Sequence, residues 1–326
     1  MDQTRDFDLE ENLQFALDSG HNVWVIGDIH GFNLTLRELI DKLELVQGDF
    51  VVILGDLIDR GPNSFDVVQF VKNSKNLASL KGNHEKMMID LLTTAGLESP
   101  DYHLMNWLRV GGLSTVSSYI NAFTDDSGVE DSKGLDNIIN FDREWMSNLP
   151  SQIVLDKWRL VHGGYDPNIP IDEHTDEQLL YIRKPFHNAE KPIDEERTVL
   201  FGHSVTVSLP GVGSKNWGNV WYSPVTLNDG RPAAIGLDTC VYHRFDSPAV
   251  LTAYNLQNGE VVQQARVEPW NNAAIAAANE VEIGSGSANS AKSAHLSNKW
   301  MPELESPCDC GSKRLFSKRS FAPEHR

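Results

Sequence analysis

The stretch Gly55-Asp-Leu-Ile-Asp-Arg-Gly61 decides how the rest of this sequence is interpreted. It directly follows a short, β-branched apolar run at residues 50–54, which predicts a buried strand. Asp56, Asp59 and Arg60 therefore lie on a loop that leaves the carboxyl end of a strand, where open α/β sheets place their ligands. Because carboxylates bind cations and a guanidinium binds anions, the loop predicts a site for a metal-bound phosphate. A polar turn closed by two glycines is the structural alternative.

A second loop of this kind lies upstream, where the apolar run 23–26 leads into Gly27-Asp-Ile-His-Gly31. Asp28 and His30 are two residues apart, so an extended backbone would point both side chains the same way. A carboxylate beside an imidazole suits a divalent ion such as manganese, iron or zinc. Capping of the following helix by Asn33 or Asp28 is the alternative, but capping does not require the histidine.

The strand, loop and helix pattern occurs a third time, where the run 77–80 leads into Lys81-Gly-Asn-His-Glu85. Right-handed crossovers between parallel strands would bring all three loops to one edge of a sheet. A purely structural explanation would need three independent coincidences, so we favour a shared site. The side chains expected to converge there are Asp28, His30, Asp56, Asn83 and His84.

The second half of the chain adds two histidines at strand ends. A hairpin predicted over 152–161 leads into His162-Gly-Gly164, and the run 199–201 leads into Gly202-His203. One histidine after a strand is more often a turn residue than a ligand, but two more after the earlier set favour ligands. Seven other histidines are interpreted as surface or loop residues: His21, His103, His174, His187, His243, His295 and His325.

Residues 100–149 separate the two halves and are expected to be mostly helical. Apolar side chains such as Leu104, Trp107 and Leu108 predict that this segment covers one side of the sheet. It holds no obvious chemistry, and Arg109-Val-Gly-Gly112 marks a break within it.

Composition limits the classes of partner. The 326 residues carry 46 acidic against 28 basic side chains and a net charge of −18, so nucleic acid and membrane surfaces are not expected partners. Three cysteines cannot form a disulfide framework, which fits a reducing compartment. The first residues lack the apolar core of a signal peptide, and no apolar run approaches membrane-spanning length. The sequence therefore predicts a soluble, cytoplasmic protein.

The motifs, in this order, resemble those of the phosphoprotein phosphatase (PPP) family, within the calcineurin-like metallophosphoesterase superfamily. Tyr181-Ile-Arg183, Gly236-Leu-Asp-Thr-Cys240 and Leu251-Thr-Ala253 extend the resemblance, which spans about residues 23–267 and is closest to compact bacterial and bacteriophage serine/threonine protein phosphatases. The resemblance implies an α/β (α+β) fold, a β-sandwich flanked by helices, with a dimetal site at one edge of the sheets. It implies a metal-dependent phosphomonoesterase that hydrolyses phosphoserine and phosphothreonine by attack of a metal-bridging hydroxide.

The resemblance also implies a role for each site residue. Two divalent ions, manganese first and iron or zinc as alternatives, would be held by six side chains: Asp28, His30, Asp56, Asn83, His162 and His203. The first three would hold one ion and the last three the other, with Asp56 bridging both. Arg60 and Arg183 would bind the phosphoryl oxygens. His84 would protonate the leaving alkoxide, and Asp59 would orient its imidazole.

The resemblance and the composition together divide the chain into two parts. We expect a metallophosphoesterase catalytic domain over 1–268 and, over 269–326, a flexible low-complexity linker followed by a disordered basic tail. Cys308 and Cys310 supply only half of a four-ligand zinc pattern, so a closed structural zinc site is not expected. The basic tail suits docking to an acidic partner.

Two alternatives stay open. The first is a dinucleoside polyphosphate (diadenosine tetraphosphate) hydrolase of the same superfamily, but Asp59-Arg60 followed by Gly82-Asn-His-Glu85 favours the protein phosphatase branch. Symmetrical diadenosine tetraphosphatases tend to lose that first aspartate and to end the second motif in Asp. The second alternative is a non-catalytic scaffold, although inactive relatives usually lose a ligand or the general acid and all are present here. Expected partners are phosphoprotein or phosphopeptide substrates.

Overall fold

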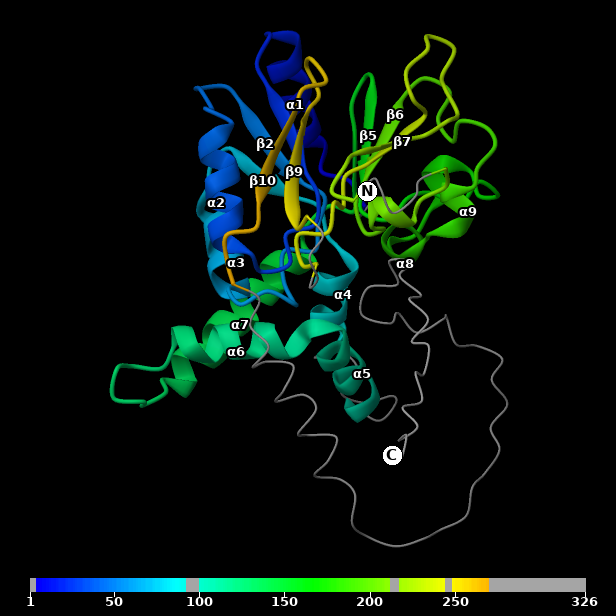
Figure 1. The fold of residues 1–326 in the computed structure, drawn as a ribbon. Helices are drawn as coiled ribbons and strands as arrows, with labels where there is room; N and C mark the ends of the chain where they lie inside the picture. The colour runs from blue at the N-terminus through cyan, green and yellow to red at the C-terminus, as the bar shows by residue number, and fades with distance from the viewer. Residues whose placement is uncertain (1–3, 92–99, 212–216, 244–247, 270–326) are drawn as a thin grey trace, which may run out of the picture.

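Two five-stranded sheets form the centre of the structure, and helices cover their outer faces (Figure 1). This computed structural model describes residues 4–91, 100–211, 217–243 and 248–269. The predicted α/β fold with two sheets flanked by helices is confirmed. The predicted linker and tail lie almost wholly outside the described residues, so that division of the chain stays a prediction.

The first sheet has the strand order β10-β9-β1-β2-β3. Its parallel half comprises the three strands expected from the sequence: β1 (Val23–Ile26), β2 (Phe50–Ile53) and β3 (Leu77–Ser79). β9 (Val250–Asn255) pairs antiparallel with β1, and β10 (Val261–Ala265) pairs antiparallel with β9. Ile26 is in register with Ile53, and Ile53 with Ser79, so the three strands end level.

The second sheet has the order β4-β5-β6-β8-β7. The predicted hairpin is present as β4 (Gln152–Val154) and β5 (Trp158–Val161), which pair antiparallel. β5, β6 (Thr198–Phe201) and β8 (Ala234–Gly236) are parallel and also end level, while β7 (Trp221–Tyr222) closes the edge. Each sheet therefore presents several strand ends along one edge.

Alternating side chains of the short strands face two different cores. Val23 and Val25 of β1 pack between the sheets with residues of the second sheet such as Leu160. Trp24 and Ile26 face the opposite way and pack beneath the helices that cover the first sheet. A strand of four apolar residues is therefore buried on both faces, as expected for a parallel sheet under helices.

The helices cover the sheets and the end where the predicted loops lie. α1 (Phe7–Asp18) packs against the core between the sheets, and α2 (Asn33–Lys42) and α3 (Ser64–Asn73) cover the first sheet (Figure 1). The remaining helices are α4 (Asn83–Asp90), α5 (Pro100–Trp107), η1 (Leu108–Gly112), α6 (Leu113–Ala122), α7 (Ser132–Ser147), η2 (Ile171–Glu173), α8 (Asp176–Tyr181), α9 (Lys184–His187) and η3 (Thr206–Ser208). Among the described helices, no segment has the length and apolar character needed to cross a membrane.

The amino-terminal end of α2 is capped from the far end of the described chain. Phe32 at the N-cap position makes no side-chain capping bond. Instead, the buried carboxylate of Glu268 accepts hydrogen bonds from the backbone N–H of Leu34 (2.5 Å) and of Thr35 (3.2 Å) and from the Thr35 hydroxyl (2.5 Å). Thr35 Oγ1 in turn accepts from the backbone N–H of Val267 (2.9 Å). A carboxylate at this position satisfies free N–H groups and complements the helix dipole.

Two of the histidines predicted to be surface or loop residues lie in loops, as predicted, but their side chains are buried. His174 accepts a hydrogen bond from the backbone N–H of Asp166 (2.8 Å). His243 packs its ring against Trp217, with ring centroids 4.1 Å apart. A loop histidine that packs or bonds to backbone in this way leaves no periodic pattern in the sequence.

Candidate dimetal site

The predicted site residues lie together at the shared edge of the two sheets, immediately after the strand ends. The loops that carry them depart from ordinary backbone conformations, because five non-glycine residues there have positive φ: His30, Asp56, Asp59, Arg60 and His203. Such conformations are costly and persist only where surrounding contacts enforce them, as they often do at functional sites. Here the backbone N–H of His30 donates to the Asp56 carbonyl (2.8 Å), which ties the first two loops together.

Asp56 stands between two buried groups of side chains that could each hold a metal ion. Its Oδ2 lies 3.6 Å from Nε2 of His30 and 3.9 Å from Nε2 of His84. Its Oδ1 faces the other way and lies 3.4 Å from Nε2 of His162, in the group that also contains His203. One carboxylate thus offers an oxygen to each group, as the predicted bridging role of Asp56 requires.

In the second group Nδ1 of His203 can donate to Asn83 Oδ1 (2.8 Å), but that oxygen and Nε2 of His162 are acceptors that face each other, which fits a metal ion. Nδ1 of His162 donates to the Leu54 carbonyl (2.8 Å), and burial lowers the pKa of His162 to about 3, so the ring is neutral and Nε2 keeps its lone pair. That Nε2 lies 2.9 Å from Asn83 Oδ1, which is also an acceptor. Acceptors that face one another repel unless a cation lies among them. Nε2 of His203 is buried and has no hydrogen-bond partner among the described residues.

The first group shows the same outer-sphere support. Nδ1 of His30 donates to the Ile58 carbonyl (3.0 Å), which directs the Nε2 lone pair towards Asp56. Asp28 lies at the border of this group, because its Oδ2 is 4.0 Å from Nε2 of His30. Both carboxylate oxygens of Asp28 accept the backbone N–H of His203 (3.0 Å each), so Asp28 also ties the first sheet to the second.

Buried charge at the site calls for a cation. Burial, together with repulsion from Asp238, raises the pKa of Asp28 well above its usual value. Burial and repulsion from Asp28 raise the pKa of Asp56 in the same way. Burial and the positive charge of nearby arginines lower the pKa of His30 and of His203. Carboxylates that resist ionisation beside neutral imidazoles are what a divalent ion would stabilise in their ligating forms.

Glu85, which received no role from the sequence, holds the central loop in shape. Its wholly buried carboxylate accepts backbone N–H groups from Asp56 (2.9 Å), Leu57 (2.8 Å) and Gly82 (2.8 Å). Burial raises the pKa of Glu85 to about 7, while these hydrogen bonds act in the opposite direction. The last residue of the predicted motif at 81–85 thus shapes the loop that carries the bridging carboxylate.

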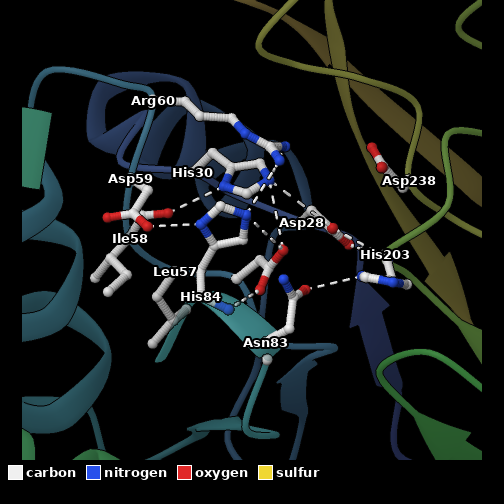
Figure 2. A network of polar contacts seen from close by, with 12 residues as sticks. Asp28, His30, Leu57, Ile58, Asp59, Arg60, Asn83, His84, His203 and Asp238 are labelled. Carbon is white, nitrogen blue, oxygen red and sulfur yellow. Dashed lines mark hydrogen bonds and ion pairs between the residues drawn. The ribbon is translucent and has the colours of Figure 1, made fainter. Parts of the chain in front are cut away.

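A hydrogen-bonded pair, Asp59 and His84, lies beside the first group (Figure 2). Nδ1 of His84 donates to Asp59 Oδ2 at 2.6 Å, so Nε2 of His84 faces the metal-binding residues. Arg60 reaches over both histidines, because its guanidinium lies 2.6 Å from Nε2 of His30 and 3.1 Å from Nε2 of His84. The Tyr242 ring packs against that guanidinium at 4.2 Å. A cation and an oriented imidazole are thus held at the edge of the predicted metal site.

Arg183 also reaches the site, but from the second sheet. Its Nη1 donates to the carbonyl of His203 (3.1 Å) and to Ser204 Oγ (2.9 Å). Ser204 therefore helps to hold the second arginine next to a predicted ligand.

The structure thus assembles all ten predicted site residues and adds others. In the tight first group His84 takes the place predicted for Asp28. One added residue is Asp238, a buried carboxylate that lies near Asp28 and His203 in Figure 2. The sequence motif at 236–240 contains it and could have identified it. No sequence motif identified the other added residues, which contact Asp59 or Arg60: Trp107, Thr115 and Tyr242.

Comparison with known proteins agrees with this geometry. The family model for calcineurin-like phosphoesterases matches residues 21–207. The chain is 28% identical over 193 residues to serine/threonine-protein phosphatase 2 of Escherichia coli K12, covering 56% of this chain and 79% of the relative. It is 25% identical over 238 residues to a symmetrical bis(5'-nucleosyl)-tetraphosphatase of Escherichia coli O139:H28, covering 59% and 83% respectively.

A solved structure supports the fold. The crystal structure of a candidate diadenosine tetraphosphatase superposes with a TM-score of 0.50 and 20% identity, over 76% of this chain and 95% of that one. Residues 21–207, which the family model matches, contain the strand-end loops and both groups of candidate metal ligands. The chain therefore belongs to the calcineurin-like phosphoesterase family, and its buried histidine and aspartate groups are consistent with the two-ion site of a metal-dependent phosphoesterase.

Proposed function

We propose that this protein is a serine/threonine protein phosphatase of the PPP type, which hydrolyses phosphoserine and phosphothreonine in protein or peptide substrates. The observation that carries the proposal is the 2.6 Å hydrogen bond between Asp59 and Nδ1 of His84. An alkoxide is a poor leaving group at neutral pH and needs a proton as it departs, whereas a nucleotide polyphosphate leaves without one. A histidine held by a buried carboxylate supplies that proton.

Two arginines and one histidine beside the candidate metal ligands each have a role in this reaction. Arg60 and Arg183 bind phosphoryl oxygens, and their permanent positive charge stabilises the negative charge that spreads over the group in the transition state. Asp59 accepts the Nδ1–H of His84 and so orients the ring, and the doubly protonated ring passes its Nε2 proton to the departing oxygen.

The six ligand candidates hold the metal ions. His30 and Asp56 belong to one group of potential ligands, and Asp56, His162 and His203 belong to the other. Asp28 would complete the ligands of one ion, and Asn83 those of the other. When bound, a pair of divalent ions supplies Lewis acidity and lowers the pKa of water so that it can attack phosphorus near pH 7. Manganese, iron and zinc all suit this mixture of oxygen and nitrogen donors.

Hydrolysis of a dinucleoside polyphosphate is the second candidate function. Its support is the tetraphosphatase relative, 83% of which is covered by the match. The two functions differ in how much they depend on Asp59, because only an alkoxide needs the proton that Asp59 and His84 deliver.

The test compares kcat/KM for a phosphoserine peptide and for diadenosine tetraphosphate, with manganese supplied. We expect the peptide to be the better substrate, and we expect Asp59→Asn to slow the peptide reaction by roughly 10- to 100-fold. A wild-type preference for diadenosine tetraphosphate, unaffected by Asp59→Asn, would establish the second function instead. Absence of chelator-sensitive hydrolysis of p-nitrophenyl phosphate would leave only a scaffold.

A further inference from the structure

We propose that the segment Trp107–Thr115, which joins α5 to α6 through η1, positions both Asp59 and Arg60 for catalysis. Trp107, Gly111 and Thr115 are then positioning residues for the predicted acid pair and for the phosphate-binding arginine. The inference rests on the proposed roles of Asp59 and Arg60. It gives a function to the break at residues 109–112, which the sequence marked but did not explain.

Two residues of the segment hold the carboxylate of Asp59. Trp107 donates its indole Nε1–H to Oδ2 (2.9 Å), the same oxygen that accepts from His84. Thr115 donates its hydroxyl to Oδ1 (2.6 Å) and accepts the backbone N–H of Asp59 (2.9 Å). All four side chains are buried. Both carboxylate oxygens are therefore fixed, and so is the direction in which His84 is held.

A glycine of the segment packs against Arg60 instead. The backbone N–H of Arg60 donates to the Gly111 carbonyl (3.2 Å), which also accepts from Ser114 Oγ (2.7 Å). A Cβ atom at position 111 would lie 2.8 Å from Cγ and 2.8 Å from the backbone nitrogen of Arg60. Only glycine permits this approach, and its φ of 127° is also unsuited to other residues.

The unusual shape of the segment explains how it makes three contacts. η1 is a kink between two helices, with a non-helical backbone at Gly111 (φ 127°, ψ 0°). Gly112 lies directly against the Trp107 indole, with no room for a Cβ atom between them. The two adjacent glycines thus bring the segment against Arg60 on one side and bring Trp107 into place on the other.

Core packing is the competing explanation, because Trp107 belongs to the hydrophobic core around α2 and α3. Packing predicts that substitutions lower stability and affect all substrates alike. Positioning predicts two separable kinetic effects. Loss of support for Asp59 should slow substrates with alkoxide leaving groups most, and displacement of Arg60 should weaken phosphate binding whatever the leaving group.

The positioning of Asp59 by this segment is tested with Thr115→Val, which keeps the shape of the side chain and removes its hydroxyl. We expect kcat for a phosphoserine peptide to fall by about 10-fold or more, with a smaller change for p-nitrophenyl phosphate, whose leaving group needs less protonation. Thr115→Ser should restore most of the peptide activity. Ser118→Ala is the matched control, because Ser118 is a buried hydroxyl on α6 that contacts Phe65 N–H rather than Asp59.

The positioning of Arg60 by this segment is tested with Gly111→Ala. We expect KM and the inhibition constant for inorganic phosphate to rise by roughly 10-fold for both substrates, because displacement of about 1 Å is enough to impair a positioned group. Gly128→Ala is the matched control, since Gly128 also has positive φ (79°) but no atom lies near its added Cβ. Bound manganese and the unfolding midpoint are measured for every variant.

The inference is wrong if Thr115→Val slows both substrates equally, or if Gly111→Ala binds phosphate like Gly128→Ala. If Gly111→Ala does not fold, the leaving-group dependence of Thr115→Val decides the matter. Asp59→Asn and Arg60→Ala serve as references. If these two leave the leaving-group dependence and phosphate inhibition unchanged, the proposed function has failed rather than the positioning role of the segment.

Discussion

The half-buried histidine at the end of α9 makes stability depend on pH in a way that can be isolated. The ring of His187 stacks on Phe201, with centroids 5.6 Å apart and planes inclined by 28°. Its Nε2 is buried and has no hydrogen-bond partner among the described residues. Burial, with a smaller effect of Arg183, lowers the pKa of His187 from 6.5 to about 4. Protonation is therefore easier in the unfolded chain than in the fold.

This difference in pKa sets the direction in which the free energy of unfolding changes with pH. The stability contributed by neutral His187 is fully present above pH 6.5 and is lost as the pH falls towards 4, because only the unfolded chain binds the proton in that window. For these two pKa values, wild-type stability should fall by about 2 kcal/mol between pH 7.5 and pH 5 because of this residue. His187→Phe should remove that fall while keeping the contact with Phe201.

The assay is urea unfolding at both pH values, with a chelator present so that metal binding does not contribute. His187→Gln is the control, because it removes the titration without supplying an aromatic ring; it should be less stable than His187→Phe but equally insensitive to this proton. If wild type and His187→Phe lose the same free energy of unfolding between pH 7.5 and pH 5, the reasoning about burial is refuted.

Four further substitutions test the site and the fold. His84→Asn should keep bound metal and slow phosphoserine hydrolysis by roughly 100-fold or more, with a smaller effect on aryl phosphates; loss of metal would make His84 a ligand. Asp56→Asn should weaken binding at both metal positions in a manganese titration, because a neutral amide bridges two cations poorly; retention of two ions would exclude the bridging role. Arg183→Ala should raise KM and weaken phosphate inhibition at constant metal content, and unaltered phosphate inhibition would assign the role to another residue. Glu268→Ala should lower the free energy of unfolding by about 1–2 kcal/mol through loss of the α2 cap, which urea unfolding would detect; an unchanged midpoint would show that water replaces the carboxylate.

The strand-end residues could be predicted because their chemistry and their position coincide in the sequence. Asp28 and Asp56 each follow a short apolar run closely, so parallel pairing of β1 and β2 brings them to one edge. His162 follows a run of the same kind in the second sheet and reaches the site because the two sheets pack together. It was less predictable which of these side chains would lie together in one metal-binding group. Whether His84 or Asp28 lies nearer to Asp56 depends on loop conformations with positive φ, which sequence patterns do not specify.

The supporting residues could not be predicted, for a different physical reason. Trp107 and Thr115 lie 48 and 56 residues from Asp59, on helices whose pattern is fully explained by packing. A threonine hydroxyl that faces a carboxylate has the same sequence context as one that faces water.

The contact between Glu268 and the start of α2 has a practical consequence for anyone who shortens this chain. α2 begins two residues after the loop that carries Asp28 and His30, so its first turn is the anchor of a predicted metal-binding loop. A protein cut after residue 269 keeps the carboxylate and the Val267 N–H that Thr35 accepts, whereas one cut after residue 265 loses both. Four residues at the boundary would then separate a chain that binds metal normally from one whose first loop is poorly anchored.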